Sequence, residues 1–177
     1  LRLWNQANFG EDLVFGHRGG SVYYWDATNG VTTRAVLLSS LSGASDVPTS
    51  QNIVLVSDIN RFVFCFGTND LGTSTVDPML VRWSDQEDAV NWTPSATNQA
   101  GSLRLSKGTE IVAARQARQE VLVWSDSSLY SLQYVGAPAV WTASLVGENI
   151  SIVSQNSVAY ANGVAYWMGT DKFYMYD

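Results

Sequence analysis

Apolar and polar residues alternate along most of the chain, in runs of four to seven residues that are rich in β-branched and aromatic side chains. Gly, Asn, Asp and Ser separate these runs. A period of two places successive side chains on opposite faces of a strand, and turn residues between such runs favour antiparallel pairing. The pattern therefore predicts an all-β chain. One segment, 84–91, favours a helix of about two turns, in which Ser84 caps the first turn and Glu87 completes a capping box.

The strand pattern repeats along the chain. Residues 53–66 align without gaps with residues 111–124, and both segments have the pattern strand, tight turn, strand. Residues 3–15 and 158–168 fit the same frame, and Asn162-Gly163 is a residue pair that favours a two-residue hairpin turn. A third strand, rich in aromatic or other apolar residues, is predicted after each hairpin, at 22–25, 79–83, 129–134 and 173–176. Four hairpins with one added strand each are therefore expected.

The spacing of these units is close to that of β-propeller blades. A small residue ends each hairpin, and these residues lie roughly 45 to 60 positions apart, at Gly16, Gly67, Ser125 and Gly169. Propeller blades repeat every 40–50 residues or so and contain four strands. The innermost strands are predicted at 33–38, 102–105 and 144–153, and the first unit lacks one. The sequence thus predicts a single β-propeller-like region over 1–177, with units at about 1–26, 33–84, 102–134 and 144–177.

The number of units is small for a closed ring. The chain begins inside one predicted strand and stops inside another, with three full units and most of a fourth. A propeller must close its ring. We therefore expect these residues to form part of a larger propeller in a longer chain. The alternative is a complete four-bladed domain that lacks one strand.

Composition narrows the classes of function. Charged residues make up 15% of the chain, against about 25% in average soluble proteins, and the net charge is -6. This charge argues against a surface that grips nucleic-acid phosphates. Aromatic residues make up 12%, with seven tryptophans, which predicts burial in the chain's own core or against neighbours. The sequence has no run of 18 apolar residues, so no membrane span is expected.

Candidate chemistry is sparse. His17 is the one histidine and lies in a predicted turn, with no GxSxG motif to complete a serine-type triad. Cys65 is the one cysteine, which excludes an internal disulfide, and its apolar neighbours suggest that it packs as a small apolar residue. No glycine-rich phosphate loop precedes a helix. The sequence therefore predicts no enzyme: no catalytic residue, no cofactor and no metal ion.

A few residues remain as candidates for interactions. Asp85, Glu87 and Asp88 form the densest acidic cluster, which we interpret as charges at a helix start or at an interface. Arg115 and Arg118 flank a predicted turn and could contact a phosphate or a neighbour's acid, with a solvated turn as the alternative. Long polar loops are predicted at 39–50, 67–78 and 91–101, and loops of this length often bind or contact a neighbouring chain.

A series of unusual motifs lies in the second half of the chain: Val-Arg-Trp-Ser-Asp-Gln-Glu-Asp at 81–88, Asn-Trp-Thr-Pro at 91–94, Asn-Gln-Ala-Gly at 98–101, and Val-Gly-Glu-Asn at 146–149. Together with residues 163–176, these motifs resemble the tail proteins of tailed bacteriophages. The nearest resemblance is to the nozzle or tail-hub proteins of short-tailed phages, also described as packaged-DNA stabilisation proteins. Residues 1–80 resemble this family only in strand pattern, and proteins of long-tailed phages share similar signatures.

The resemblance implies a structural protein of the virion tail that bears a β-propeller and has no catalytic residues. Its expected partners are other tail subunits in a six-fold homo-oligomer, the head-to-tail adaptor, and double-stranded DNA that passes through a channel without sequence readout. The acidic net charge suggests a channel surface that repels DNA phosphates.

Two other functions stay open at this point. One is a carbohydrate-binding or receptor-binding propeller of a phage, in which exposed Trp92 and Trp141 stack on sugar rings. The other is a cellular propeller scaffold.

Overall fold

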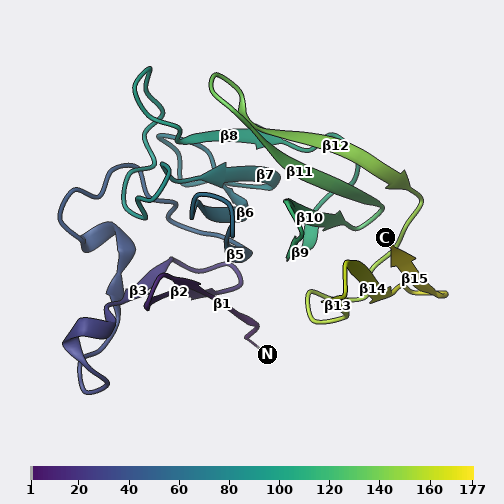
Figure 1. Ribbon diagram of the computed structural model, residues 1–177, viewed down its shortest axis with the longest axis horizontal. Helices are drawn as coiled ribbons and strands as arrows, with labels where there is room; N and C mark the ends of the chain where they lie inside the picture. The colour runs from purple at the N-terminus through teal and green to yellow at the C-terminus, as the bar shows by residue number, and fades with distance from the viewer. Residues whose placement is uncertain (1) are drawn as a thin grey trace.

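The computed structural model describes residues 2–177 and is all-β, with four antiparallel sheets (Figure 1). The first sheet contains β1 (Trp4–Phe9), β2 (Asp12–His17), β3 (Tyr23–Trp25) and β4 (Val36–Leu37). The second contains β5 (Ile53–Val56), β6 (Val63–Asn69), β7 (Val76–Trp83) and β8 (Gly101–Arg104). Two short 3-10 helices, η1 (Ala27–Asn29) and η2 (Leu38–Ser40), follow β3 and β4.

The second half of the chain repeats this arrangement. The third sheet contains β9 (Ile111–Ala117), β10 (Glu120–Ser125), β11 (Ser128–Gly136) and β12 (Val140–Glu148). The fourth has three strands, β13 (Val158–Ala161), β14 (Val164–Met168) and β15 (Phe173–Tyr176). Within every sheet, each strand pairs with the strand next to it in sequence.

All four predicted hairpins and their third strands are confirmed. Asn162 and Gly163 both have positive φ, 53° and 85°, as a two-residue hairpin turn between β13 and β14 requires. The aligned segments 53–66 and 111–124 nevertheless turn differently. Residues 57–62 connect β5 to β6, whereas residues 118–119 connect β9 to β10.

The sheets follow one another around an arc (Figure 1). Their first strands lie next to each other on its inner side: β5 contacts both β1 and β9, and β9 contacts β13. The prediction that 33–38, 102–105 and 144–153 form innermost strands is wrong. β4 falls within the first of these segments, and β8 and β12 overlap the second and the third. Each pairs with the third strand of its own sheet as the fourth and last strand. In an antiparallel meander each new strand pairs at the edge that is still free, so the fourth strand of a sheet lies farthest from the first.

The predicted helix at 84–91 is also wrong. Glu87 has a φ of 56°, which lies in the left-handed region and ends any right-handed helix. The Ser84 hydroxyl accepts a hydrogen bond from the backbone N–H of Val63 at 3.0 Å, so it is not free to cap a following turn. The segment is instead an irregular loop after β7.

Three clusters of buried apolar side chains join consecutive sheets, one cluster at each junction. The first to second junction is built around Val14, Val54, Val63, Cys65 and Trp92. The second to third junction is the largest and contains Phe62, Phe64, Phe66, Trp83, Val121, Val123 and Trp141. The third to fourth junction contains Leu122, Trp124, Ala165 and Trp167. The aromatic residues therefore serve mainly to pack one sheet on the next.

Candidate functional site

A hollow of about 380 Å³ lies where the first strands meet. Residues of β1, β5 and β9 line it, together with Asn156. Arg115 is the one charged residue in this lining, and desolvation lowers the pKa of its guanidinium. The guanidinium donates hydrogen bonds to the carbonyl oxygens of Ala114 at 2.8 Å and Gln155 at 2.7 Å. Arg115 therefore ties the third sheet to the loop before β13.

The structure does not bring Arg115 and Arg118 together. Arg118 lies in the turn after β9, where its backbone N–H donates to the hydroxyl of Tyr160 at 2.9 Å. Its exposed side chain borders a different depression, which Glu120, Tyr134 and Tyr176 also line. The two arginines thus do not form one basic site for a phosphate.

Two of the three acidic candidates, Asp85 and Asp88, act within their own loop, and the third, Glu87, joins this loop to the one between β5 and β6. One Asp85 carboxylate oxygen accepts from the backbone N–H groups of Gln86 and Gln99, both at 2.8 Å. One Asp88 oxygen accepts from Val90 at 2.8 Å. Glu87 is exposed and forms an ion pair with Arg61, whose Nε donates at 2.7 Å. Within residues 2–177, no group of three or more His, Cys, Asp or Glu side chains is placed to hold a metal ion.

The motifs between residues 81 and 101 interlock with one another. The Trp83 indole N–H donates to the Gln99 carbonyl at 2.8 Å, and the Gln99 side chain donates to Gln86 at 2.8 Å. Gly101 lies against the Trp83 ring, where an added Cβ would come within 2.8 Å of a ring carbon. These residues therefore fasten the loop between β7 and β8 to the edge of the second sheet.

Both tryptophans suggested for sugar stacking are buried. Trp92 is 1% exposed and its indole N–H donates to the Ala89 carbonyl at 2.8 Å. Trp141 is 3% exposed and packs edge-on against Phe64. Neither ring face is available to a carbohydrate in this structure, so the exposure that the carbohydrate-binding alternative requires is not found.

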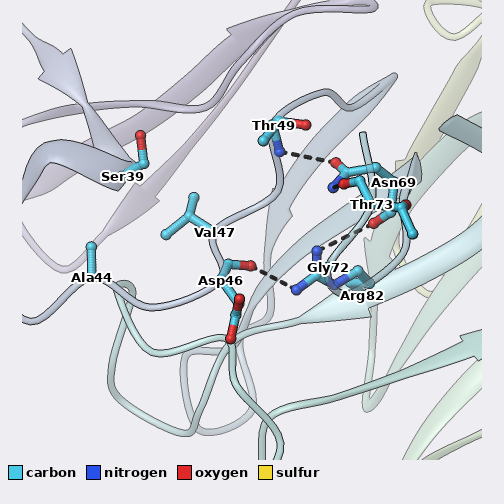
Figure 2. Close-up of a pocket in the computed structure, with 9 residues that line it drawn as sticks. All are labelled: Ser39, Ala44, Asp46, Val47, Thr49, Asn69, Gly72, Thr73 and Arg82. Carbon is cyan, nitrogen blue, oxygen red and sulfur yellow. Dashed lines mark hydrogen bonds between the residues drawn. The ribbon is translucent and has the colours of Figure 1, made fainter. Parts of the chain in front are cut away.

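A second hollow, of about 280 Å³, lies beside β7 and was not predicted as a site (Figure 2). Two of the long polar loops meet there: Ser39, Ala44, Asp46, Val47 and Thr49 come from the first, and Gly72 and Thr73 from the second. Asn69 and Arg82 complete the lining. The one signal in the sequence is an arginine inside the apolar run 79–83, which forms the end of β7. Side chains alternate between the two faces of a strand, so Arg82 is expected on one face of the sheet among buried neighbours.

Arg82 clamps these two loops. Its guanidinium donates to the carbonyl oxygens of Asp46 at 2.7 Å and Asn69 at 3.2 Å, as Figure 2 shows. The side chain is 3% exposed and lies 6.0 Å from the centre of the Trp92 ring. No carboxylate within the described residues lies at salt-bridge distance, and desolvation lowers the pKa of Arg82. Carbonyl dipoles and an aromatic face thus replace a counter-ion.

His17 and Cys65 have structural surroundings. His17 ends β2, where its ring packs edge-on against Trp4 at 5.5 Å and its Nδ1 lies 3.1 Å from the Arg18 carbonyl oxygen. Cys65 is completely buried in the first to second sheet junction. Within residues 2–177, neither the His17 ring nor the Cys65 thiol forms a hydrogen bond with another side chain.

We expect Cys65 to resist thiol reagents in the folded protein. Burial raises its pKa far above the ordinary thiol value, and only the thiolate reacts. Alkylation followed by mass spectrometry in native buffer should leave Cys65 unmodified, and the same treatment in denaturant should modify it fully. Rapid modification in native buffer would show that the junction opens readily.

Comparisons with known proteins assign no family. The chain matches no protein-family model, and no curated protein matches it significantly in sequence. Within residues 2–177, no helix has the length and apolar character needed to cross a membrane.

Proposed function

We propose that this chain is a structural component of a bacteriophage tail, in the nozzle or tail hub, where it forms part of the wall of the DNA channel below the head-to-tail adaptor. The observation that carries the proposal is the series of motifs between residues 81 and 101, which resembles that family. In the structure these motif residues hold one another through Trp83, Asp85 and Gln99. These residues hold the conformation of the loop between β7 and β8, which is consistent with a structural role and requires no reaction chemistry.

The arrangement of the sheets supports the finer proposal of a larger β-propeller. Propeller blades are antiparallel meanders that pack face to face, with their first strands near a common axis. The four sheets follow this order, and the first strands β1, β5 and β9 share one hollow. Repetition of such units around an axis, each packed on its neighbours, gives a rigid wall.

The proposed role requires no catalysis. Six copies around the tail axis would surround the DNA, and the chain would contribute packing surfaces and charge. A net charge of -6 gives little electrostatic attraction to phosphate, which favours passage of DNA without capture. The carbohydrate-binding alternative loses its two named stacking residues, Trp92 and Trp141, because both are buried.

An image of the native particle tests this proposal. We expect antibodies raised against the chain to label purified phage particles at the tail axis, and averaged images to show density for the chain in a ring there. Particles of a mutant phage that lacks the gene should retain heads but lose this density. Absence of the chain from purified particles, with all of it recovered as free protein, would contradict the proposal.

A further inference from the structure

The hollow beside β7 has a buried floor and an open rim (Figure 2). Arg82 and Asn69 form the floor, and each is 3% exposed. The rim consists of exposed residues from the loops 39–50 and 67–78: Ser39, Asp46, Thr49, Gly72 and Thr73. Every lining residue lies between positions 39 and 82, so the hollow is built by the interior of the described segment. A solute that passes the rim meets a cation at the floor.

The guanidinium group of Arg82 has donors to spare. Such a group carries five N–H donors. Hydrogen bonds within residues 2–177 use two of them, one on each terminal nitrogen, for the carbonyl oxygens of Asn69 and Asp46. Carbonyl groups are dipoles without net charge, and a buried cation without an anion is unfavourable. The floor of the hollow therefore offers unused N–H groups and a positive charge that lacks an ion-pair partner.

Asn69 fixes the two loops around Arg82. Its Oδ1 accepts from the backbone N–H groups of Thr49 at 2.9 Å and Ser50 at 3.2 Å. Its Nδ2 donates to the carbonyl oxygen of Thr73 at 2.8 Å. The walls of the hollow are thus in place without a ligand, and a preformed site loses less conformational entropy on binding.

The rest of the lining indicates which anion fits. Ala44 and Val47 give part of the wall an apolar surface, which suits a short hydrocarbon group. The negative charge of Asp46 is near enough to influence the pKa of Arg82, so it would also repel a bound anion, and a doubly charged phosphate more than a monoanion. A volume of about 280 Å³ admits only a small molecule. A planar carboxylate also matches the geometry of a guanidinium group.

We propose that this hollow binds a small monocarboxylate, whose carboxylate group pairs with the guanidinium of Arg82 and whose hydrocarbon part lies against Ala44 and Val47. The ligand would join the loops 39–50 and 67–78 at the point where Arg82 already connects them, and so would stabilise the folded chain. This inference rests on the geometry of the hollow and does not depend on a role in a phage tail.

The experiment uses sodium propionate as the probe, with the ionic strength held constant by sodium chloride. The readout is the ¹H–¹⁵N resonance of the Arg82 Nε–H group, identified as the arginine resonance that is missing from the spectrum of Arg82→Lys. We expect propionate to shift this resonance in a saturable way, with a Kd of about 1–10 mM, and chloride to leave it in place. Inorganic phosphate should bind at least about three-fold more weakly than propionate, because Asp46 repels the second charge.

Two variants remove the site in different ways. Arg82→Met removes the cation, and Arg104→Met, at an exposed arginine, is its matched control. Ser39→Phe fills the hollow from the rim and leaves the Arg82 clamp intact, and Val31→Phe, at a position 91% exposed in a loop, is its matched control. Circular dichroism establishes folding. At 50 mM propionate we expect Tm to rise by about 2–4 °C in the wild type and both controls, and by less than about 1 °C in both site variants.

Asp46→Asn should bind propionate more tightly than the wild type does. Asp46 has a φ of 49°, which asparagine also adopts readily, and asparagine retains an oxygen for the Thr93 hydroxyl. The backbone carbonyl group that Arg82 contacts is unchanged. Loss of the rim charge should lower the Kd for propionate about three-fold, and the Kd for phosphate by more. A purely structural role for Arg82 predicts no such gain.

Four results would overturn the inference. They are an Arg82 resonance that moves no further with propionate than with chloride, propionate binding that persists in Ser39→Phe, phosphate that binds the wild type as tightly as propionate, and an Asp46→Asn variant whose affinity for propionate is unchanged or weaker. None of these outcomes bears on whether the chain is found in a phage tail, which the particle images decide separately.

Discussion

Replacement of Phe64 by alanine should lower the free energy of unfolding by about 3–5 kcal/mol, the usual cost of truncating a buried aromatic residue. Phe64 is fully buried in the junction between the second and third sheets. Its ring packs edge-on against Trp141 at 4.9 Å, stacks on Phe66 at 5.6 Å and lies 6.1 Å from Trp83. The substitution therefore leaves a cavity among three large rings that cannot collapse without moving two sheets.

Urea denaturation followed by tryptophan fluorescence measures this effect, since two of the neighbouring rings are indoles. Val31→Ala serves as the control: Val31 is 91% exposed, and a substitution at such a position should change the free energy of unfolding by less than about 0.5 kcal/mol. If the two variants unfolded at the same urea concentration, the second to third sheet junction would not be the main core.

Replacement of Arg82 by methionine should cost about 2–4 kcal/mol of stability. Methionine retains most of the apolar volume of the side chain but donates no hydrogen bonds. The carbonyl oxygens of Asp46 and Asn69 would lose their partners, each at a cost of about 1–3 kcal/mol when buried. The contact of the guanidinium with the Trp92 ring would also be lost.

Arg104→Met is the matched control for Arg82→Met. Arg104 donates to Asp77 at 2.6 Å, but its side chain is 59% exposed, so its loss should cost less than about 1 kcal/mol. Arg82→Lys should lie between the wild type and Arg82→Met, since an ammonium group cannot reach both carbonyl oxygens as the planar guanidinium does. Denaturation gives the stabilities, and limited proteolysis should show faster cleavage within 39–50 and 67–78. A stable, protease-resistant Arg82→Met would contradict the clamp.

Local signals in the sequence were sufficient for the hairpins. Asn162-Gly163 specifies its turn because both residues accept positive φ. The unbroken apolar runs 53–56 and 63–66 indicate paired strands that are buried on both faces. The same signals could not give the position of each strand within its sheet. β12 begins one hairpin turn after β11, and nothing in its residues distinguishes an outer strand from an inner one.

The repeat frame also misplaced the faces of the first sheet. Gly16 was aligned with Gly67, which would make Phe15 equivalent to Phe66 and turn it toward the next sheet. In the structure Val14 takes that position and Phe15 lies on the opposite face. A shift of one residue exchanges the two faces of a strand, and the small residue after the hairpin does not fix its register.

The candidate interaction residues were chosen by charge and aromaticity, which do not reveal burial. Asp85 and Asp88 are engaged by backbone N–H groups of a loop that had been predicted as a helix, and Trp92 is covered by the loops around it. The surroundings of Arg82 depend on two loops that lie far from it in sequence, at Asp46 and at Asn69. Such a contact follows from the three-dimensional packing and has no local signal.

Each sheet shares its buried apolar clusters with the sheets immediately before and after it in the chain. Order along the polypeptide is thus the same as order in space. During synthesis, every sheet that leaves the ribosome can be laid on one that is already complete, with no need to wait for a distant partner segment. Among residues 2–177, the second and third sheets are packed on both sides by sheets of this segment, and the first and fourth on one. For these residues as an isolated chain, resistance to local opening should therefore decline from the middle toward both ends.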